Sequence, residues 1–284
     1  MNDWDSANTS GIPRLTNDSI ADAAQQLESD CVIDAIYPGR PLIISFNYFT
    51  QQKEFDMFGY MRKLENRVGA PFNRIYLRDS KDKWFQFGVK GLGGSVNEVA
   101  QKLSRLIRFI APSEVITIGQ SMGGYAAILY GILLQADRAI GFGPLSNLDP
   151  RQHHMDGDVR WLPLMTRLYV DRPDNWFPDI VSLALSSLIL PDLHIVAGTH
   201  PIGTGSLPNK DKTHIDRFAK IPGVSIYEYP EAQHEVSVWL AERKLLDDLL
   251  YQMIVEPKVR ESPPIHIQSG ENETRQYATV NYTN

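Results

Sequence analysis

The sequence predicts an α/β fold with a mostly parallel central sheet and helices on both of its faces. Short apolar stretches alternate with helix-forming ones, and most of these stretches are nearly continuous in apolar residues instead of alternating regularly with polar ones. A strand of that kind is buried on both faces, as in parallel sheets. Six such strands are expected, at residues 42–46, 74–77, 115–118, 138–142, 193–197 and 224–229.

The most informative stretch is 115–124, which reads Val-Ile-Thr-Ile-Gly-Gln-Ser-Met-Gly-Gly. Four β-prone residues lead into a glycine-flanked serine, and helix-forming residues follow at 125–130. A strand, a sharp turn with Ser121 at its apex and a helix form the arrangement called the nucleophile elbow. The sequence therefore predicts Ser121 as a nucleophile.

The spacing of the two glycines has a steric reason. A sharp turn presses together the residues two before and two after the serine, so a residue without Cβ is favoured at Gly119 and Gly123. The helix after Ser121 points its first N–H groups at the reaction centre, where they stabilise negative charge. The same turn thus supplies a nucleophile and a donor.

Before the elbow, the pattern predicts a helix at 51–64 and an amphipathic helix at 95–110. Ser95 and Glu98 have the spacing of a capping box at the start of the second helix. Between the two helices, residues 79–94 form a long loop that can shape the rim of a pocket. A short helix at 20–27 is also expected.

After the elbow, residues 145–192 are irregular and helical, and we interpret them as a lid-like insertion. A short helix at 213–220 and a long closing helix at 235–254 follow. We expect an N-terminal extension at 1–40, the α/β domain at 41–255 and a polar tail at 256–284.

A serine hydroxyl needs a base to take its proton, and an acid to orient that base. His234 lies just after the last expected strand, where the base belongs when the chain order is serine, acid, histidine. Asp211 precedes the expected helix after strand 193–197 and is the preferred acid, although it also suits a helix N-cap. Asp216 and Asp149 remain alternatives.

A tetrahedral oxyanion needs two N–H donors. The backbone N–H of Met122, at the start of the helix after the elbow, is one expected donor. The second is expected from the loop after strand 42–46, from the backbone N–H of Asn47 or Tyr48.

Other polar and aromatic groups carry weaker signals of a site. The histidines and acids of the segment 153–158 have a spacing that fits no closed set of metal ligands. Neither a phosphate-binding loop nor a dinucleotide fingerprint is present, so we expect no metal and no cofactor. Three tryptophans suit either the core or a pocket for an acyl group or a sugar, namely Trp84, Trp161 and Trp176.

Composition narrows the class of protein. The 284 residues are 43% hydrophobic and 22% charged, with a net charge of −6, which disfavours nucleic acid as a partner. The N-terminus lacks a signal-peptide pattern, and the apolar region 181–190 is interrupted and too short to span a bilayer. The single cysteine, Cys31, fits a cytoplasmic location and is not expected to be a nucleophile.

With this order of serine, acid and histidine, the chain resembles the α/β-hydrolase superfamily over residues 41–254. The segment 119–127, Gly-Gln-Ser-Met-Gly-Gly-Tyr-Ala-Ala, is similar to the elbow of small bacterial serine esterases and acyl hydrolases. The resemblance implies Ser121 as nucleophile, His234 as base and Asp211 as acid. The chain departs from the family at 46–49, Phe-Asn-Tyr-Phe, where many members carry His-Gly or Gly-Gly.

The resulting hypothesis is a serine hydrolase of the ester-hydrolase class that cleaves a carboxylic ester or thioester through an acyl-enzyme. Its expected substrate is a small-molecule or glycan-linked acyl ester. An acyltransferase would pass the same acyl group to a sugar or an amine. A third hypothesis is a non-catalytic scaffold, because a fold does not guarantee its chemistry.

Overall fold

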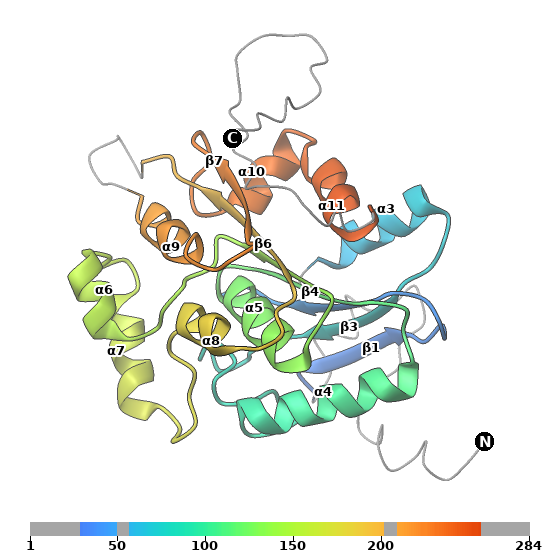
Figure 1. Cartoon of the computed structure of the whole chain (residues 1–284), viewed down its shortest axis with the longest axis horizontal. Coiled ribbons are helices and arrows are strands. Elements are labelled where there is room, and N and C mark those ends of the chain that lie inside the picture. The colour runs from blue at the N-terminus through green and yellow to red at the C-terminus, as the bar shows by residue number, and fades with distance from the viewer. Residues whose placement is uncertain (1–28, 50–56, 202–208, 257–284) are drawn as a thin grey trace.

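A seven-stranded sheet forms the centre of the molecule in the computed structural model, which describes residues 29–49, 57–201 and 209–256 (Figure 1). The strand order is β1-β3-β2-β4-β5-β6-β7, and every pairing from β3 to β7 is parallel. The strands are β1 (Cys31–Ala35), β2 (Leu42–Phe46), β3 (Asn73–Leu77), β4 (Val115–Gln120), β5 (Arg138–Phe142), β6 (Asp192–Gly198) and β7 (Ser225–Tyr229). The six predicted strands are confirmed within two residues at their ends.

The seventh strand, β1, was not predicted. It pairs antiparallel with β3 at the edge of the sheet, with Cys31 opposite Leu77. Two ion pairs attach this edge to β3 and the residues after it: Asp34 with Arg74, and Asp30 Oδ1 with Arg78 Nε at 2.7 Å. The segment 31–35 therefore belongs to the sheet, although it lies within the stretch 1–40 that we expected to be an extension.

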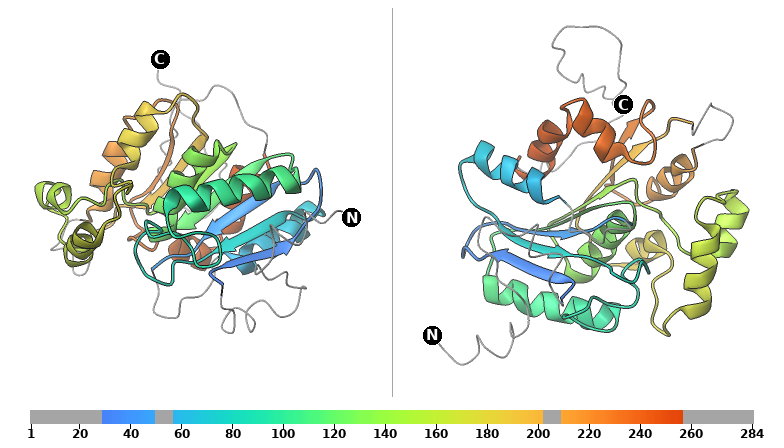
Figure 2. Two further views of the ribbon diagram at one scale, coloured as in Figure 1. Left: turned by 90° about the horizontal axis from the view of Figure 1, so that it is seen from below. Right: turned by 180° about the vertical axis from the view of Figure 1, so that it is seen from behind.

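Helices cover both faces of the sheet, as predicted for a parallel sheet (Figures 1 and 2). One face packs against α4 (Val96–Ile110), α5 (Met122–Leu134), α8 (Ile180–Ser186) and α9 (Asp211–Phe218). The other packs against α3 (Phe58–Val68), α10 (Val236–Glu242) and α11 (Leu246–Ile254). Two hydrophobic cores result, one on each side of the sheet.

Local sequence explains where the helices begin and end. Ser95 caps α4, because its side chain accepts the Glu98 N–H. The apolar side of this amphipathic helix is buried, at Val96, Val99, Leu103, Leu106 and Ile110. Helix α5 is apolar on all sides and is buried from Met122 to Ile132, so it lies at the centre of its layer. The helix predicted at 51–64 begins at Phe58 among the described residues, and its first part lies outside them, as do residues 20–27 and the tail from 257.

The prediction of one long closing helix at 235–254 was wrong. The chain instead forms α10 and α11, separated at 243–245. Lys244 has a φ of 60° there, a left-handed conformation that interrupts a helix. The break contains neither proline nor glycine, so the sequence carries no ordinary signal for it.

The segment 145–192 follows β5 and contains α6 (Pro150–Asp156), α7 (Leu162–Asp171) and α8. Helices α6 and α7 lie at one side of the molecule, beside the sheet and not over it (Figures 1 and 2). Met165 and Leu168 of α7 and Ile180, Val181 and Ala184 of α8 still reach the core of the α5 face. Asn147 and Asp179 form a β-bridge that closes the segment upon itself.

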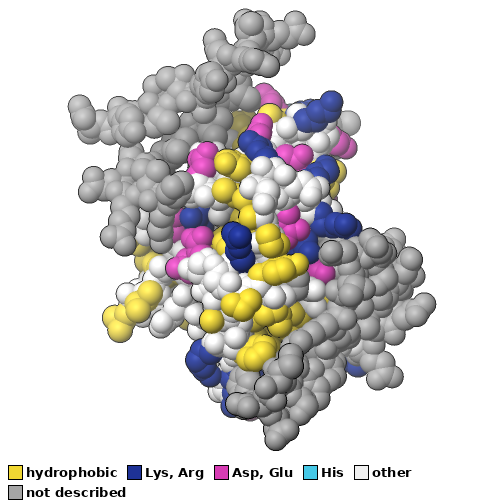
Figure 3. All heavy atoms as spheres, turned by 90° about the vertical axis from the view of Figure 1, so that its right-hand side faces the viewer, with side chains coloured by type: hydrophobic (Ala, Val, Ile, Leu, Met, Phe, Trp, Pro, Cys, Tyr) yellow, Lys and Arg dark blue, Asp and Glu magenta, His cyan; other side chains and the backbone are white. Residues whose placement is uncertain are grey.

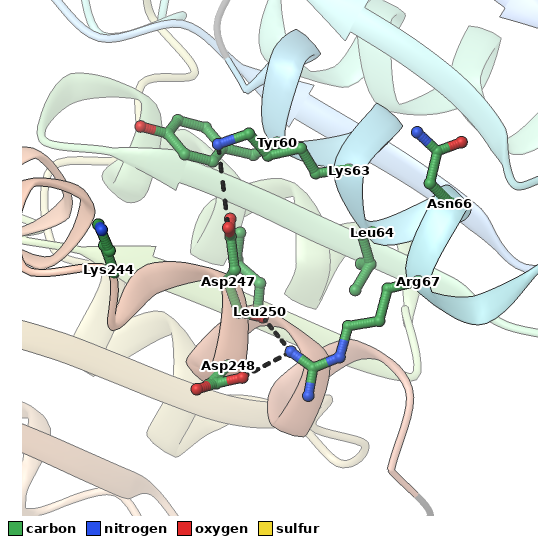
Figure 4. A pocket seen from close by; sticks show the side chains of 9 residues that line it. All are labelled: Tyr60, Lys63, Leu64, Asn66, Arg67, Lys244, Asp247, Asp248 and Leu250. Carbon is green, nitrogen blue, oxygen red and sulfur yellow. Dashed lines mark hydrogen bonds and ion pairs between the residues drawn. The ribbon is translucent and has the colours of Figure 1, made fainter.

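Two surface features complete the fold. A pocket of about 430 Å³ lies between α3 and α11 (Figure 4); its walls include Lys63, Arg67, Asp247 and Asp248, whose ion pairs are largely exposed. The face drawn in Figure 3 carries mixed charges and apolar side chains, with no histidine visible among the described residues.

In the part of the chain that the structure describes, no helix has the length and apolarity needed to cross a membrane.

Candidate active site

The turn between β4 and α5 places Ser121 in a strained conformation. Its φ is 53° and its ψ is −114°, a region that residues with a Cβ rarely adopt. The Ser121 N–H donates to the Phe142 carbonyl at 2.7 Å, and the Tyr125 N–H donates to the Ser121 carbonyl at 2.9 Å. These bonds hold the turn between the end of β5 and the first turn of α5, so the serine is fixed at the apex predicted from sequence.

The flanking glycines allow three backbone segments to meet. A Cβ on Gly119 would lie 2.3 Å from the Gly123 carbonyl oxygen, and a Cβ on Gly123 would lie 2.2 Å from the Phe46 carbonyl oxygen. Both distances are shorter than any real Cβ contact. The first and last residues of the Gly-x-Ser-x-Gly spacing are therefore glycines for a steric reason, and the loop after β2 lies directly against the elbow.

Ser121 lies in a line of hydrogen bonds with a histidine and an aspartate. Ser121 Oγ is 2.8 Å from His234 Nε2, and His234 Nδ1 is 2.8 Å from Asp211 Oδ2. Ser121 and His234 are each 8% exposed and Asp211 is 3% exposed. The elbow supplies the serine, the loop after β7 the histidine, and the first residue of α9 the aspartate.

Burial and charge act in opposite directions on these groups. Burial lowers the pKa of His234, but the nearby carboxylates, Asp211 above all and Glu235, raise it, and the pKa lies above its ordinary value of 6.5. Burial raises the pKa of Asp211, yet His234 and Arg160 together hold it below its usual value. Asp211 is thus kept ionised beside an imidazole that can become charged.

Comparisons with known proteins rest on structure alone. No protein-family model matches the chain, and no curated protein matches its sequence. The 2,6-dihydroxy-pseudo-oxynicotine hydrolase superposes with a TM-score of 0.51 at 14% identity, over 79% of this chain and 64% of its own. The fluorophosphonate-binding serine hydrolase F of Staphylococcus aureus superposes with a TM-score of 0.51 at 16% identity, over 78% of this chain and 86% of its own.

The chain has the α/β-hydrolase fold. At these identities the likeness extends to the fold and no further, so the role of each residue has to be argued from this chain's own geometry. In this fold the strand order and the elbow after β4 bring the loops that follow β2, β6 and β7 to one edge of the sheet.

The alternative acids lie elsewhere in the hydrolase fold. Asp149 caps α6, where its carboxylate accepts from the Arg151 N–H and guanidinium. The Asp216 side chain is 63% exposed and pairs with Lys212 on the surface of α9. Of the three aspartates weighed from the sequence, the structure brings Asp211 to His234.

Of the two backbone N–H groups considered in the loop after β2, the one of Asn47 already has a partner. The Asn47 N–H donates to the Leu77 carbonyl at 3.0 Å as a continuation of the sheet, so the expectation that it could serve is corrected. The Tyr48 N–H has no acceptor among the described residues, and the Met122 N–H, at the first position of α5, has no partner within its helix. These two groups remain the candidate donors.

Gln120 was not singled out from the sequence, yet it positions the histidine loop. Its Nε2 donates to the His234 carbonyl at 3.1 Å, and its Oε1 accepts the Ser237 N–H at 3.3 Å. The residue before the nucleophile therefore ties the loop after β7 to β4. The sequence signal that could have indicated this role is a glutamine at the end of a predicted buried strand, directly before the nucleophile.

An aromatic cluster adjoins His234. The Trp161 ring centroid lies 6.0 Å from that of His234 and 6.4 Å from that of Trp84, and Phe49 lies 6.1 Å from Trp161. The third tryptophan considered for a pocket, Trp176, packs instead on Tyr169 at 5.8 Å. Of the three tryptophans considered for a pocket, Trp161 thus lies beside His234 and Trp84 lies next to Trp161.

A group of possible metal ligands is present beneath the site, at His153, Asp158 and His214, with ligand atoms within 4.8 Å of one another. The Ser146 N–H donates to His214 Nδ1 at 3.1 Å, which leaves the proton of neutral His214 on Nε2, facing Asp158. The Arg160 guanidinium contacts both oxygens of Asp158. A cation would have to displace a proton and oppose a guanidinium, so these residues fit a hydrogen-bond network better than a metal.

Arg160 was missed by the sequence reasoning. Its Nη1 lies 2.8 Å from Asp211 Oδ1, the carboxylate oxygen opposite the one that faces His234. The two residues are 51 positions apart, and Arg160 precedes α7 in an irregular stretch. No local pattern in the sequence marks such a long-range pair.

Proposed function

We propose that the protein is a serine hydrolase that cleaves a carboxylic ester or thioester. The observation that carries the proposal is the line from Ser121 through His234 to Asp211, with 2.8 Å at each step and the serine at a strained elbow. A serine in such a turn, hydrogen-bonded to a histidine that is itself oriented by a carboxylate, is activated for attack on a carbonyl.

The reaction follows from these positions. Ser121 Oγ attacks the carbonyl carbon while His234 Nε2 takes the hydroxyl proton, and the negative charge of Asp211 stabilises the imidazolium. The tetrahedral intermediate collapses when His234 returns the proton to the leaving alcohol or thiol. Water then attacks the acyl-enzyme, His234 takes one of its protons, and Ser121 regains a proton as the carboxylic acid leaves.

The developing oxyanion lies between two segments. The Met122 N–H belongs to the positive end of α5, and the Tyr48 N–H belongs to the loop that Gly123 brings against the elbow. Backbone donors of this kind are already oriented, so little reorganisation is needed when charge develops.

The aromatic cluster of Phe49, Trp84 and Trp161 supports an ester with an apolar part. Trp161 lies beside His234 and packs on Phe49, and both rings are partly exposed, while Trp84 is buried behind them. We propose a small-molecule or glycan-linked acyl ester whose apolar portion packs against this cluster.

The test is hydrolysis of p-nitrophenyl esters, from acetate to octanoate, by the wild type, Ser121→Ala and Ser104→Ala. Ser104 lies on α4 and bonds its own helix, at Ala100, so its replacement is a matched control. Turnover by the wild type and the control, with loss in Ser121→Ala, supports the proposal. If the wild type is as inactive as Ser121→Ala on every ester, simple esterase chemistry is contradicted. Acyl transfer from a labelled ester to a sugar or an amine is then measured. Inactivity in that assay as well favours a non-catalytic role.

A further inference from the structure

A second Ser-His-Asp array lies beneath the candidate site. Ser146 Oγ is 2.9 Å from His214 Nδ1, and His214 Nε2 is 3.3 Å from Asp158 Oδ2. The hydrogen bonds run from serine to histidine to aspartate, as they do from Ser121 through His234 to Asp211. Its residues come from the loop after β5, from α9 and from the stretch between α6 and α7.

This second array is not a second active site. Ser146 and Asp158 are 0% exposed and His214 is 2% exposed, so no substrate reaches the serine. His214 Nδ1 also accepts the Ser146 backbone N–H at 3.1 Å, which leaves it no free position to take a proton from a hydroxyl nucleophile. The bonds orient His214 so that its Nε2–H donates to Asp158.

Arg160 joins the two arrays. Its Nε and Nη2 donate to the two oxygens of Asp158 at 2.9 and 2.8 Å, and its Nη1 donates to Asp211 Oδ1 at 2.8 Å. Nη1 also lies 3.3 Å from Asn209 Oδ1. A guanidinium has the planar, forked shape needed to bond two carboxylates at once, which an ammonium lacks.

The geometry points to Arg160 as a positioning residue of the hydrolase site: anchored on the buried Asp158, it holds Asp211 toward His234. The inference rests on the proposed function for its effect on turnover. It also implies that the segment 145–192 takes part in assembling the site, because Ser146, Asp158 and Arg160 all belong to it.

The charges around the two groups determine the sign of the effect. Asp211 faces His234 from α9, Glu235 follows it in the chain, and Arg160 faces it from the far side of Asp211. Asp158, Asp211 and Asn209 surround Arg160, and the two histidines that face Asp158 are His214 and His153, whose Nδ1 is 3.9 Å away. The positive charge of Arg160 lowers the pKa of His234, against the effect of Asp211.

The experiment compares Arg160→Gln, which removes the charge, with Arg160→Lys, which keeps the charge without the fork. Arg167→Gln is the matched control, because Arg167 is exposed on α7 of the same segment. Two quantities are measured for each variant: the pKa of His234 from imidazole NMR signals, and the pH profile of kcat/KM on the best ester.

In Arg160→Gln we expect the pKa of His234 to rise and the acid limb of kcat/KM to move to higher pH, because Asp211 keeps its bond to His234 while the opposing positive charge is gone. We expect kcat to fall about 10- to 100-fold, because Asp211 has lost its second anchor and orients the imidazole less precisely. In Arg160→Lys we expect kcat to fall while the limb stays near its wild-type position. Arg167→Gln should match the wild type in both quantities.

A purely structural role gives a different result. The thermal midpoint and the fraction of active protein then fall in Arg160→Gln, while the pKa of His234 and the acid limb stay at their wild-type values, which overturns the inference. If the wild type hydrolyses no ester, the proposed function fails, but the NMR titration still decides whether Arg160 acts on His234.

Discussion

The Nδ1 atom of His234 lies 2.8 Å from Asp211 Oδ2, and both residues are buried. In this setting the carboxylate has two effects: it orients the imidazole and it favours the imidazolium. Replacing the Asp211 carboxylate by an amide of the same shape removes the charge, so the variant shows how the buried imidazole behaves without it.

Asp211→Asn should therefore change both rate and pH dependence. In the wild type the pKa of His234 is raised, so kcat/KM, which needs the neutral imidazole, reaches half its maximum above about pH 6.5. Without the carboxylate charge, burial and Arg160 both lower that pKa, so the half-maximum moves below about pH 6.5. The rate constant kcat should fall by about 10³- to 10⁴-fold, because an amide stabilises the wrong tautomer.

The control for this prediction is Asp216→Asn, on the exposed surface of the same helix. Its pH profile and kcat should equal those of the wild type. An acid limb in Asp211→Asn that stays at the wild-type position would show that Asp211 does not set the charge of His234.

Tyr48→Pro tests the second oxyanion donor. Proline removes the backbone N–H at this position, and loss of one oxyanion donor typically lowers kcat by about 10²- to 10³-fold. Tyr48→Ala keeps the N–H and removes a side chain that is 41% exposed, so it should retain kcat within about threefold. Equal activity of the two variants, at equal thermal midpoints, would exclude the Tyr48 N–H as a donor.

Gly123→Ala tests the close approach of the β2 loop to the elbow. The new methyl group would lie 2.2 Å from the Phe46 carbonyl oxygen and 2.7 Å from that of Asn47, so the loop has to move. We expect a loss of about 3 kcal/mol in the free energy of unfolding and a large fall in kcat/KM. Gly59→Ala, on α3 with no atom within 4 Å of the new Cβ, is the control and should be neutral or slightly stabilising.

Asp79→Ala tests the loop that presents Trp84. The Asp79 carboxylate accepts the backbone N–H groups of Lys81, Lys83 and Phe85 at 3.0, 2.7 and 2.8 Å, and Trp84 lies in this loop at a φ of 51°. Loss of the buried acceptor should lower the free energy of unfolding by about 3 kcal/mol, measured by urea denaturation. If the exposed control Asp174→Ala shows the same midpoint as Asp79→Ala, the carboxylate does not hold the loop.

Much of this fold could be predicted because each local pattern agrees with the final structure. The interior strands are mostly apolar, and the glycines at 119 and 123 satisfy a steric need that is visible in the sequence. Strand β1 was harder, because its five residues follow a polar stretch and include Asp34, whose partner Arg74 is distant in sequence. The break between α10 and α11 depends on the left-handed backbone conformation of Lys244, and a lysine is not a residue type from which that conformation is predicted.

In the candidate site, too, some residues could be predicted from the sequence and others could not. Ser121 and His234 occupy positions defined by the order of strands, so chain order predicts their meeting. The choice of Asp211 over Asp149 and Asp216 depends on which carboxylate faces the histidine, and three-dimensional packing decides that. Arg160 bonds two aspartates, and its pair with Asp211 spans 51 positions, so no local pattern could indicate it.

The central claim, that Ser121 is an activated nucleophile, is tested most directly by reaction with a fluorophosphonate followed by peptide mass spectrometry. We predict one adduct per chain, on Ser121, absent in Ser121→Ala and formed more slowly in Asp211→Asn, with the buried Ser146 unmodified in every variant. A wild-type protein that forms no adduct, or forms it on another residue, would contradict the account.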